Sequence, residues 1–396
     1  MKQTVKGKFT FMKGFDYWLL VCVLALCVIG VIFVFSGTSD QALRANLPAN
    51  HYMLRHVGFV GFGLCFMAFG ALLDYSLWKK FSPICFFGGV LLLLLVLIMG
   101  VEVKGAKRWL MIAGVQIQPS EIMKFGVAVW VSAKFSVLKY PISDWKDYGQ
   151  KMLQSFGVLL IVALLLALQP NFSMLLIISI VCFAVLITAD IPKKYIWGTG
   201  GIVFSGLLLV GLVEQYRIKR LMGFLNPEEN AQGSAYQALN MMTAIGNGGL
   251  TGKGLGEGTQ KLGYVPEVHT DGAFALIGEE LGYIGTLIIF ACFFIIFYRG
   301  LLIADNSKSN FGKYLAICIV GFIALNMLIH VAVCLGKFPT TGQPLPFISM
   351  GGSNLCMNMF MIGVLLNISR ENTGKFLSSD NINAKYSAQK ARYSRG

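Results

Sequence analysis

The chain alternates between long apolar runs and shorter polar segments over most of its length. Each run holds roughly 20 residues, the number that an α-helix needs to cross the hydrocarbon core of a bilayer. Hydropathy and turn signals together predict ten transmembrane helices, at about 15–36, 54–75, 83–102, 119–138, 152–169, 171–189, 194–214, 273–298, 313–336 and 352–369. The pattern therefore predicts an all-α integral membrane protein.

Composition supports this class. Of the 396 residues, 56% are hydrophobic and 13% are charged. Soluble proteins carry about 25% charged residues, so this chain cannot present an ordinary water-facing surface. The first run, 15–36, is too long for a signal-peptide core and lacks a small-residue cleavage site, so we expect a retained span. The 9 Cys residues lie inside apolar runs without CxxC spacing, which indicates neither a metal site nor a disulfide framework.

Lys and Arg predict the orientation. They are more numerous in the segments that are cytoplasmic when the N-terminus is inside, so we expect both termini to be cytoplasmic. The long polar loop of about 215–272, between helices seven and eight, then lies outside. The chain divides into a cytoplasmic segment at 1–14, a ten-helix membrane domain at 15–370 and a basic tail at 371–396. The tail is rich in Ser, Asn and Lys, which predicts disorder close to the membrane.

The net charge of +14 follows this topology, so we expect no nucleic-acid partner. Several basic residues nevertheless fall on the predicted outer face, against the general trend. Basic groups there can bind a phosphate-bearing ligand, or their side chains can snorkel among lipid headgroups. The residues are Lys104, Lys107, Arg108, Arg217, Lys219, Arg220, Lys253 and Lys261.

The outer loop contains the glycine-rich sequence GNGGLTGKGLGEG at 246–258. It does not match a phosphate-binding P-loop, which requires Gly at the position of Asn247 and Ser or Thr at the position of Gly254. We interpret it as tight turns along the membrane surface that can offer backbone N–H groups to an anion.

Glu267, His269 and Asp271 stand within five residues, immediately before the eighth predicted helix. Charge at a membrane boundary is costly, so this cluster is a candidate site. One interpretation is that Thr270 or Asp271 caps the helix. The other is that Asp271 is a general base, with Glu267 and His269 tuning it or binding substrate. The two are compatible, because a helix N-terminus also stabilises a negative charge.

Five further candidates are ionisable groups inside predicted spans. Glu121 and Lys124 are three residues apart on one helix and are expected to form a structural ion pair. Glu279 and Glu280 point to different sides of their helix, so at least one should face a partner or a wet cavity. His330 is expected to be a satisfied core histidine.

The segment 338–353 is apolar but contains three prolines and three glycines. Irregular backbone at membrane depth is tolerated only where protein or a wet cavity covers it. We therefore expect a re-entrant segment that faces the long outer loop.

Four blocks of sequence resemble the SEDS family (shape, elongation, division and sporulation), and their order and spacing also match. TQKLGYVPE and PTTGQPLPF are more similar to the division and sporulation branch, FtsW and SpoVE, than to the elongation branch, RodA. The blocks are GAKRWLMIAGVQIQPSEIMKF at 105–125, QPNFS at 169–173, GNGGLTGKGLGEGTQKLGYVPEVHTDGAFALIGEELG at 246–282 and FPTTGQPLPFISMGGS at 338–353.

The resemblance implies an inverting peptidoglycan glycosyltransferase that polymerises lipid II into β-1,4 glycan strands on the outer face of the cytoplasmic membrane. It assigns catalysis to Asp271 of the HTD motif and makes Arg108 the basic residue of an ARRW-like motif. Arg108 and Lys261 would contact diphosphate, with Lys107, Glu267 and His269 as further substrate-binding candidates. Glu121 and Lys124 belong to the same group. No metal ligand is assigned, although a divalent cation such as Mg or Mn stays open.

The resemblance further implies partners and a location. The partners are lipid II, undecaprenyl-diphosphate-linked glycan, membrane lipids, a class B penicillin-binding protein and other divisome proteins. The location is the bacterial cytoplasmic membrane, at the division septum. Two alternatives remain at this stage, a lipid II flippase and a catalytically impaired divisome scaffold. Three positions depart from the family pattern: Asn171 replaces an acid, Gly272 a large apolar residue and Met350 a Tyr.

Overall fold

The computed structural model describes residues 14–370, except 104, 113, 139–143, 190, 214–217, 219, 221, 225–233 and 263–267. Each predicted span coincides with helix in this part of the chain. The long helices are α1 (Tyr17–Arg44), α2 (His51–Leu72), α4 (Ser82–Met99), α5 (Pro119–Phe135), α8 (Phe172–Thr188), α9 (Lys193–Val213), α12 (Ala273–Asn306), α13 (Asn310–Cys334) and an unlabelled last helix, Gly352–Arg370.

Shorter elements connect these helices. They are α3 (Tyr75–Lys80), α6 (Trp145–Phe156), α7 (Leu159–Leu168), α11 (Ser234–Gly248) and the 3-10 turn η2 (Gln260–Leu262). Among the described residues, 7 helices are long and apolar enough to cross a membrane. The predicted membrane helix bundle is therefore confirmed, whereas the number of ten spans and the sidedness of the loops remain predictions.

The fifth predicted span, 152–169, is not one helix. The chain forms the amphipathic helix α6, turns at residues 157 and 158, and continues as α7. At 1.5 Å per residue α7 is roughly 15 Å long, about half the thickness of a hydrocarbon core. Asp147 and Lys151 of α6 form an ion pair with 2.9 Å between Oδ2 and Nζ, which is consistent with a helix at an aqueous boundary.

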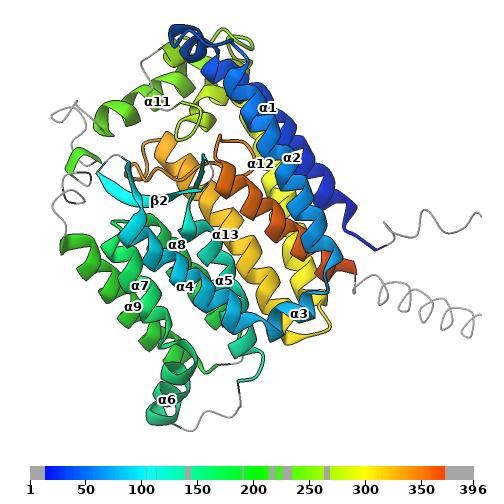
Figure 1. Ribbon diagram of the computed structural model, residues 1–396, viewed down its shortest axis with the longest axis vertical. Helices are drawn as coiled ribbons and strands as arrows, with labels where there is room; N and C mark the ends of the chain where they lie inside the picture. Colours follow the sequence, from blue (N-terminus) through cyan, green and yellow to red (C-terminus); the bar gives the residue numbers. More distant parts are fainter. Residues whose placement is uncertain are drawn as a thin grey trace, which may run out of the picture.

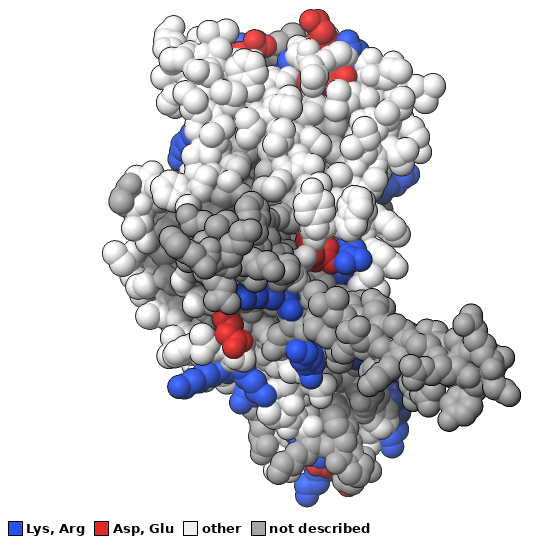
Figure 2. Space-filling model, turned by 90° about the vertical axis from the view of Figure 1, so that its right-hand side faces the viewer, with Lys and Arg blue, Asp and Glu red and all other residues white. Residues whose placement is uncertain are grey.

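Helix α13 lies at the centre of the bundle and packs against α5, α8 and α12, while α1 packs against α2 and α12 (Figure 1). Leu315, Ile319 and Phe322 of α13 are fully buried, as a central helix requires. Much of the upper surface in Figure 2 carries no charge between the groups at its top edge and the Lys and Arg side chains gathered lower down. Such an uncharged surface suits contact with lipid.

A small antiparallel sheet, which the sequence did not predict, accompanies the predicted helices. Its strands β1 (Val101–Val103), β2 (Ala106–Ile112) and β3 (Val115–Ile117) lie in the order β1-β2-β3. Gly105 and Gly114, with φ values of 76° and 77°, stand in the two connections, where L-residues with side chains are strained. The sheet occupies the whole connection between α4 and α5.

Helix α12 is interrupted at Gly282, whose φ of 64° and ψ of −161° are not helical. The interruption leaves a short first segment at 273–281 and a long second segment at 283–306. The carbonyls of Glu279 and Glu280 accept hydrogen bonds from the N–H groups of Lys253 and Gly254, both at 3.0 Å. Because this loop supplies the partners that the helix lacks, the interruption leaves neither carbonyl unpaired.

Hydrogen bonds in the opposite direction, from α12 to the loop, complete the contact at the interruption. The N–H groups of Tyr283 and Ile284 donate to the carbonyls of Gly249 and Leu250, at 2.9 and 3.2 Å. The loop at 249–254 therefore lies directly on the backbone of α12. This close approach explains the glycines of GNGGLTGKGLGEG better than an anion-binding nest, because the N–H groups of Lys253 and Gly254 already bind carbonyls.

We expect Gly282→Ala to destabilise the protein by about 1–3 kcal/mol, because a left-handed conformation strains a residue with a side chain. A Cβ at this position would also collide with the backbone N of Gly252. The measurement is thermal unfolding of the detergent-solubilised protein. Gly58→Ala in α2 is the control, since a Cβ there has no atom within 4 Å. Equal stability of the two variants would contradict the proposed role of Gly282.

Candidate functional site

The HTD segment is bound along its backbone to the irregular segment 338–350. The carbonyl of His269 accepts a hydrogen bond from the N–H of Met350 at 2.9 Å. The carbonyl of Thr270 accepts one from the hydroxyl of Ser349 at 2.7 Å. Two segments about 80 residues apart in the chain therefore form one structural unit. The prediction that 338–353 faces the end of the outer loop is confirmed at these contacts.

The start of α12 shows which residue caps the helix. Gly272 occupies the N-cap position, rather than Thr270 or Asp271. Nε2 of His330 accepts a hydrogen bond from the N–H of Phe274 at 3.4 Å, and Nδ1 lies 2.9 Å from the carbonyl oxygen of Gln343. His330 is buried and satisfied, as the sequence predicted, and it joins α12 to the 338–350 segment.

Asp271 stands immediately before α12 and is only half-buried. Its carbonyl accepts a 3.6 Å hydrogen bond from the thiol of Cys334, at the end of α13. Its Oδ2 faces Gly342, because a Cβ built on that glycine would lie 3.7 Å from this oxygen. The backbone of Asp271 is thus fixed by the bundle, while its carboxylate lies beside a glycine in the 338–350 segment.

Arg108 of β2 binds the turn between α7 and α8. Its Nε donates to the carbonyl of Gln169 at 3.1 Å, and its Nη2 donates to the carbonyl of Pro170. These two carbonyls hold the guanidinium in place at the turn. Lys107 is exposed and lies beside Glu102 in the strand register, so its side chain leaves the opposite face of the sheet.

Hydrogen bonds from α8 and from Arg220 reach the irregular segment beside Asp271. Ser173, near the start of α8, donates to the carbonyl of Thr341 at 3.5 Å, and Thr341 precedes Gly342. Nη1 of Arg220 donates to the carbonyl of Thr340 at 2.9 Å. Arg220 and the candidate base therefore meet the same irregular segment, and Arg108 lies at the turn before α8, the helix whose Ser173 contacts that segment.

Glu121 and Lys124 form the predicted ion pair, with 2.5 Å between Oε2 and Nζ, and both side chains are essentially inaccessible. Nδ2 of Asn354 donates to Glu121 at 3.0 Å, and Nδ2 of Asn358 donates to Asn354 at 2.8 Å. This network joins α5 to the last helix. Sequence analysis missed Asn354 and Asn358, although their four-residue spacing on an apolar helix was a usable signal.

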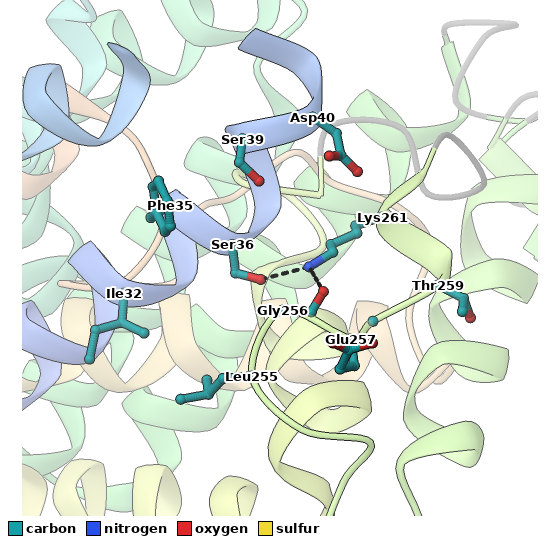
Figure 3. A pocket seen from close by; sticks show the side chains of 11 residues that line it. Ile32, Phe35, Ser36, Ser39, Asp40, Leu255, Gly256, Glu257, Thr259 and Lys261 are labelled. Carbon is teal, nitrogen blue, oxygen red and sulfur yellow. Dashed lines mark hydrogen bonds between the residues drawn. The ribbon is translucent and has the colours of Figure 1, made fainter. Parts of the chain in front are cut away.

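Lys261 lies deeper than a surface cation would. Its Nζ donates to Ser36 Oγ at 2.9 Å, to the Gly256 carbonyl at 2.6 Å and to Glu280 Oε1 at 2.8 Å. An ammonium has three donors, so the three partners use its hydrogen-bonding capacity. Figure 3 shows Lys261 between Ser36 and Gly256, at a cavity of about 370 Å³ between α1 and residues 255–261.

Three further points concern Glu267, Asn171 and a metal site. Glu267 lies outside the described residues. Asn171, at the position of the missing acid, is buried and donates from Nδ2 to Ser120 at 3.2 Å. It therefore acts as a packing contact between α8 and α5. Within the described part of the chain, no group of three or more His, Cys, Asp or Glu side chains could hold a metal ion, so we assign no metal ligand.

Comparison with known proteins gives the family. The model of the FtsW/RodA/SpoVE family, described as cell cycle protein, matches residues 17–374. The chain belongs to this family. The probable peptidoglycan glycosyltransferase FtsW of Coxiella burnetii is 36% identical over 376 residues, covering 93% of this chain and 99% of that protein. Stage V sporulation protein E of Bacillus subtilis is 34% identical over 361 residues, covering 90% and 97%.

Solved structures share the fold. A chain from "Structural coordination of polymerization and crosslinking by a peptidoglycan synthase complex" is similar at a TM-score of 0.74 and 22% identity, covering 91% of this chain and 99% of that chain. The rod shape determining protein RodA of Thermus thermophilus gives a TM-score of 0.68 at 22% identity, covering 91% and 98%. The apolar helices and this family membership together show a multi-pass membrane protein.

We expect Ser349→Ala to destabilise the protein by about 1–3 kcal/mol, because it leaves buried backbone groups without partners. Ser349 is 3% exposed and both donates to Thr270 and accepts from the N–H of Leu345 at 2.9 Å. The matched control is Ser353→Ala. Ser353 also makes two backbone hydrogen bonds, to Gln116 and Gln118, but at a more accessible position where water can replace it. Equal losses in thermal unfolding would contradict this account.

Proposed function

We propose that this chain is a peptidoglycan glycosyltransferase that polymerises lipid II into β-1,4 glycan strands during cell division. The observation that carries the proposal is the position of Asp271. Its half-buried carboxylate lies beside Gly342, where the HTD and 338–350 segments meet. The names of the relatives, FtsW and stage V sporulation protein E, support the same activity.

Asp271 is the general base in this proposal. The acceptor sugar hydroxyl loses its proton to the Asp271 carboxylate as its oxygen attacks the anomeric carbon of the donor. The bond from that carbon to the lipid diphosphate breaks, and the diphosphate leaves with the electron pair. A single displacement inverts the anomeric configuration, which gives a β linkage from an α-linked donor. The diphosphate is already a good leaving group, so a second carboxylic acid is not required.

The leaving diphosphate requires positive charge nearby. We assign this role to Arg108, whose guanidinium the carbonyls of Gln169 and Pro170 hold at the α7–α8 turn. Lys107 and His269 remain substrate-binding candidates, as does Glu267. The Glu121–Lys124 pair is buried and is held to the last helix by Asn354. Lys261 would have to give up existing hydrogen bonds to bind diphosphate.

The site should face outward from the cytoplasmic membrane, at the septum. One of the structural neighbours comes from a peptidoglycan synthase complex that coordinates polymerization and crosslinking. We therefore propose that this chain acts with a class B penicillin-binding protein, which would cross-link the strands as they form, and with other divisome proteins.

The test is lipid II polymerisation by the purified protein with its partner transpeptidase. Asp271→Asn should lower the rate about 10²- to 10⁴-fold, the usual contribution of a general base, without loss of folded protein. Asp305→Asn is the matched control, because Asp305 is an exposed acid near the other end of α12. Wild-type activity in the Asp271 variant would overturn the assignment of the base.

The same preparation separates the alternatives. A flippase would move labelled lipid II across vesicles without polymerising it, and Asp271→Asn would not change that movement. A scaffold would show neither polymerisation nor transbilayer movement while still binding its partner. Either result would replace the enzymatic proposal.

A further inference from the structure

Glu279 and Glu280 are fully buried carboxylates in the first segment of α12, and the proposed chemistry uses neither. Oε1 of Glu279 accepts hydrogen bonds from Lys253 Nζ at 2.9 Å and from the N–H and hydroxyl of Thr259 at 3.0 and 2.9 Å. Its Oε2 accepts from the N–H of Gln260 at 3.2 Å. These donors lie in the glycine-rich loop and in the two residues that follow it, so Glu279 binds residues 253–260 to the helix.

Glu280 makes a second and deeper connection. Its Oε1 accepts hydrogen bonds from Lys261 Nζ at 2.8 Å and from the Ser36 hydroxyl at 2.6 Å. Ser36 belongs to α1, so Glu280 joins the helix to both the loop and α1. Lys261 is 7% exposed, whereas Lys253 is 31% exposed. One ion pair is therefore internal and the other lies near the surface.

These contacts hold one end of the segment that has Asp271 at its other end. Residues 273–281 form a helix roughly 13 Å long at 1.5 Å per residue. The end near Asp271 is bound by His330 and the 338–350 segment. Because the helix is interrupted at Gly282, the long second segment of α12 does not determine the direction of the short first segment. The direction of the first segment therefore depends on the groups that bind its end near Gly282.

We propose that the ion pairs Glu279–Lys253 and Glu280–Lys261 orient this segment so that Asp271 meets the substrate, which makes Glu279 and Glu280 positioning residues. The proposal rests on the function proposed above. Glycine-rich loops lose much conformational freedom when they are ordered, so strong contacts are needed to hold this one. A buried ion pair with extra hydrogen bonds is such a contact, and its geometry is specific.

The main variant removes both charges of the internal pair, Lys261→Met with Glu280→Gln. Removing one partner alone would leave a buried charge uncompensated, and the protein could then fail to fold for that reason. We expect kcat for lipid II polymerisation to fall about 10- to 100-fold, since a misplacement of about 1 Å can lower a rate 100-fold. KM should change less than about threefold, because Asp271 acts in the chemical step.

Two further variants should lower kcat by smaller amounts. Glu279→Gln should lower kcat in the same way but less, because its ion pair is partly exposed. Lys261→Arg keeps the charge and should retain most of kcat. The matched control is Asp16→Asn with Arg299→Gln. That pair also joins α1 to α12, with 2.6 Å between Oδ2 and Nη2, but it lies beside the last helix's end at Ser369 and should not affect kcat.

A second readout does not depend on activity. Hydrogen exchange measured by mass spectrometry should show faster exchange at residues 268–276 in the Lys261/Glu280 variant and not in the Asp16/Arg299 control. The proposal is overturned by unchanged exchange there, by wild-type kcat, or by a change confined to KM, which would indicate direct diphosphate binding by Lys261. A wild-type protein that forms no polymer would instead refute the proposed function, and the exchange result would still decide the role of the ion pairs.

Discussion

A helix that is interrupted in a membrane protein must find partners for the backbone groups it frees, and this constraint organises the molecule. At Gly282 the partners come from residues 249–254, which give two N–H groups and take two others. The glycine-rich loop is thus an integral part of the bundle. Because the loop lies against α12, its Lys253 and the following Lys261 of η2 come within reach of Glu279 and Glu280. The interruption, the loop and the acidic pair depend on one another.

The candidate site forms where two irregular segments satisfy each other. The 338–350 segment has no regular backbone hydrogen bonding of its own, yet Leu345, Phe347 and Ile348 are buried. Buried polar groups need hydrogen-bond partners, and the segment finds some of them in the carbonyls of His269 and Thr270. The same contacts fix the backbone next to Asp271. A rigid backbone and a half-buried carboxylate are what a general base needs, because its position must be fixed while substrate can still reach it.

Much of the fold followed from hydropathy, because apolar length measures bilayer thickness directly. The sheet at 101–117 did not, since two of its three strands have only 3 residues and are too short to show a period. The fifth span was merged with α6, because an amphipathic helix followed by an apolar one gives a continuous hydropathy signal. The expectation that Glu279 or Glu280 faces a partner was confirmed for both. Their partners were not predictable, because nothing local relates Glu280 to Ser36, which is 244 residues away.

By itself, the sequence determined the membrane class, the approximate helices, the family and the residues that can carry chemistry. Each of these follows from a property of a short stretch, such as apolar length, residue type or motif. Only the tertiary structure decided which of those residues are already engaged. Lys261 binds Glu280, and Arg108 binds the carbonyls of Gln169 and Pro170. The packing also places the carboxylate of Asp271 beside Gly342. Long-range contacts set these differences, because burial and hydrogen-bond partners depend on how distant segments pack.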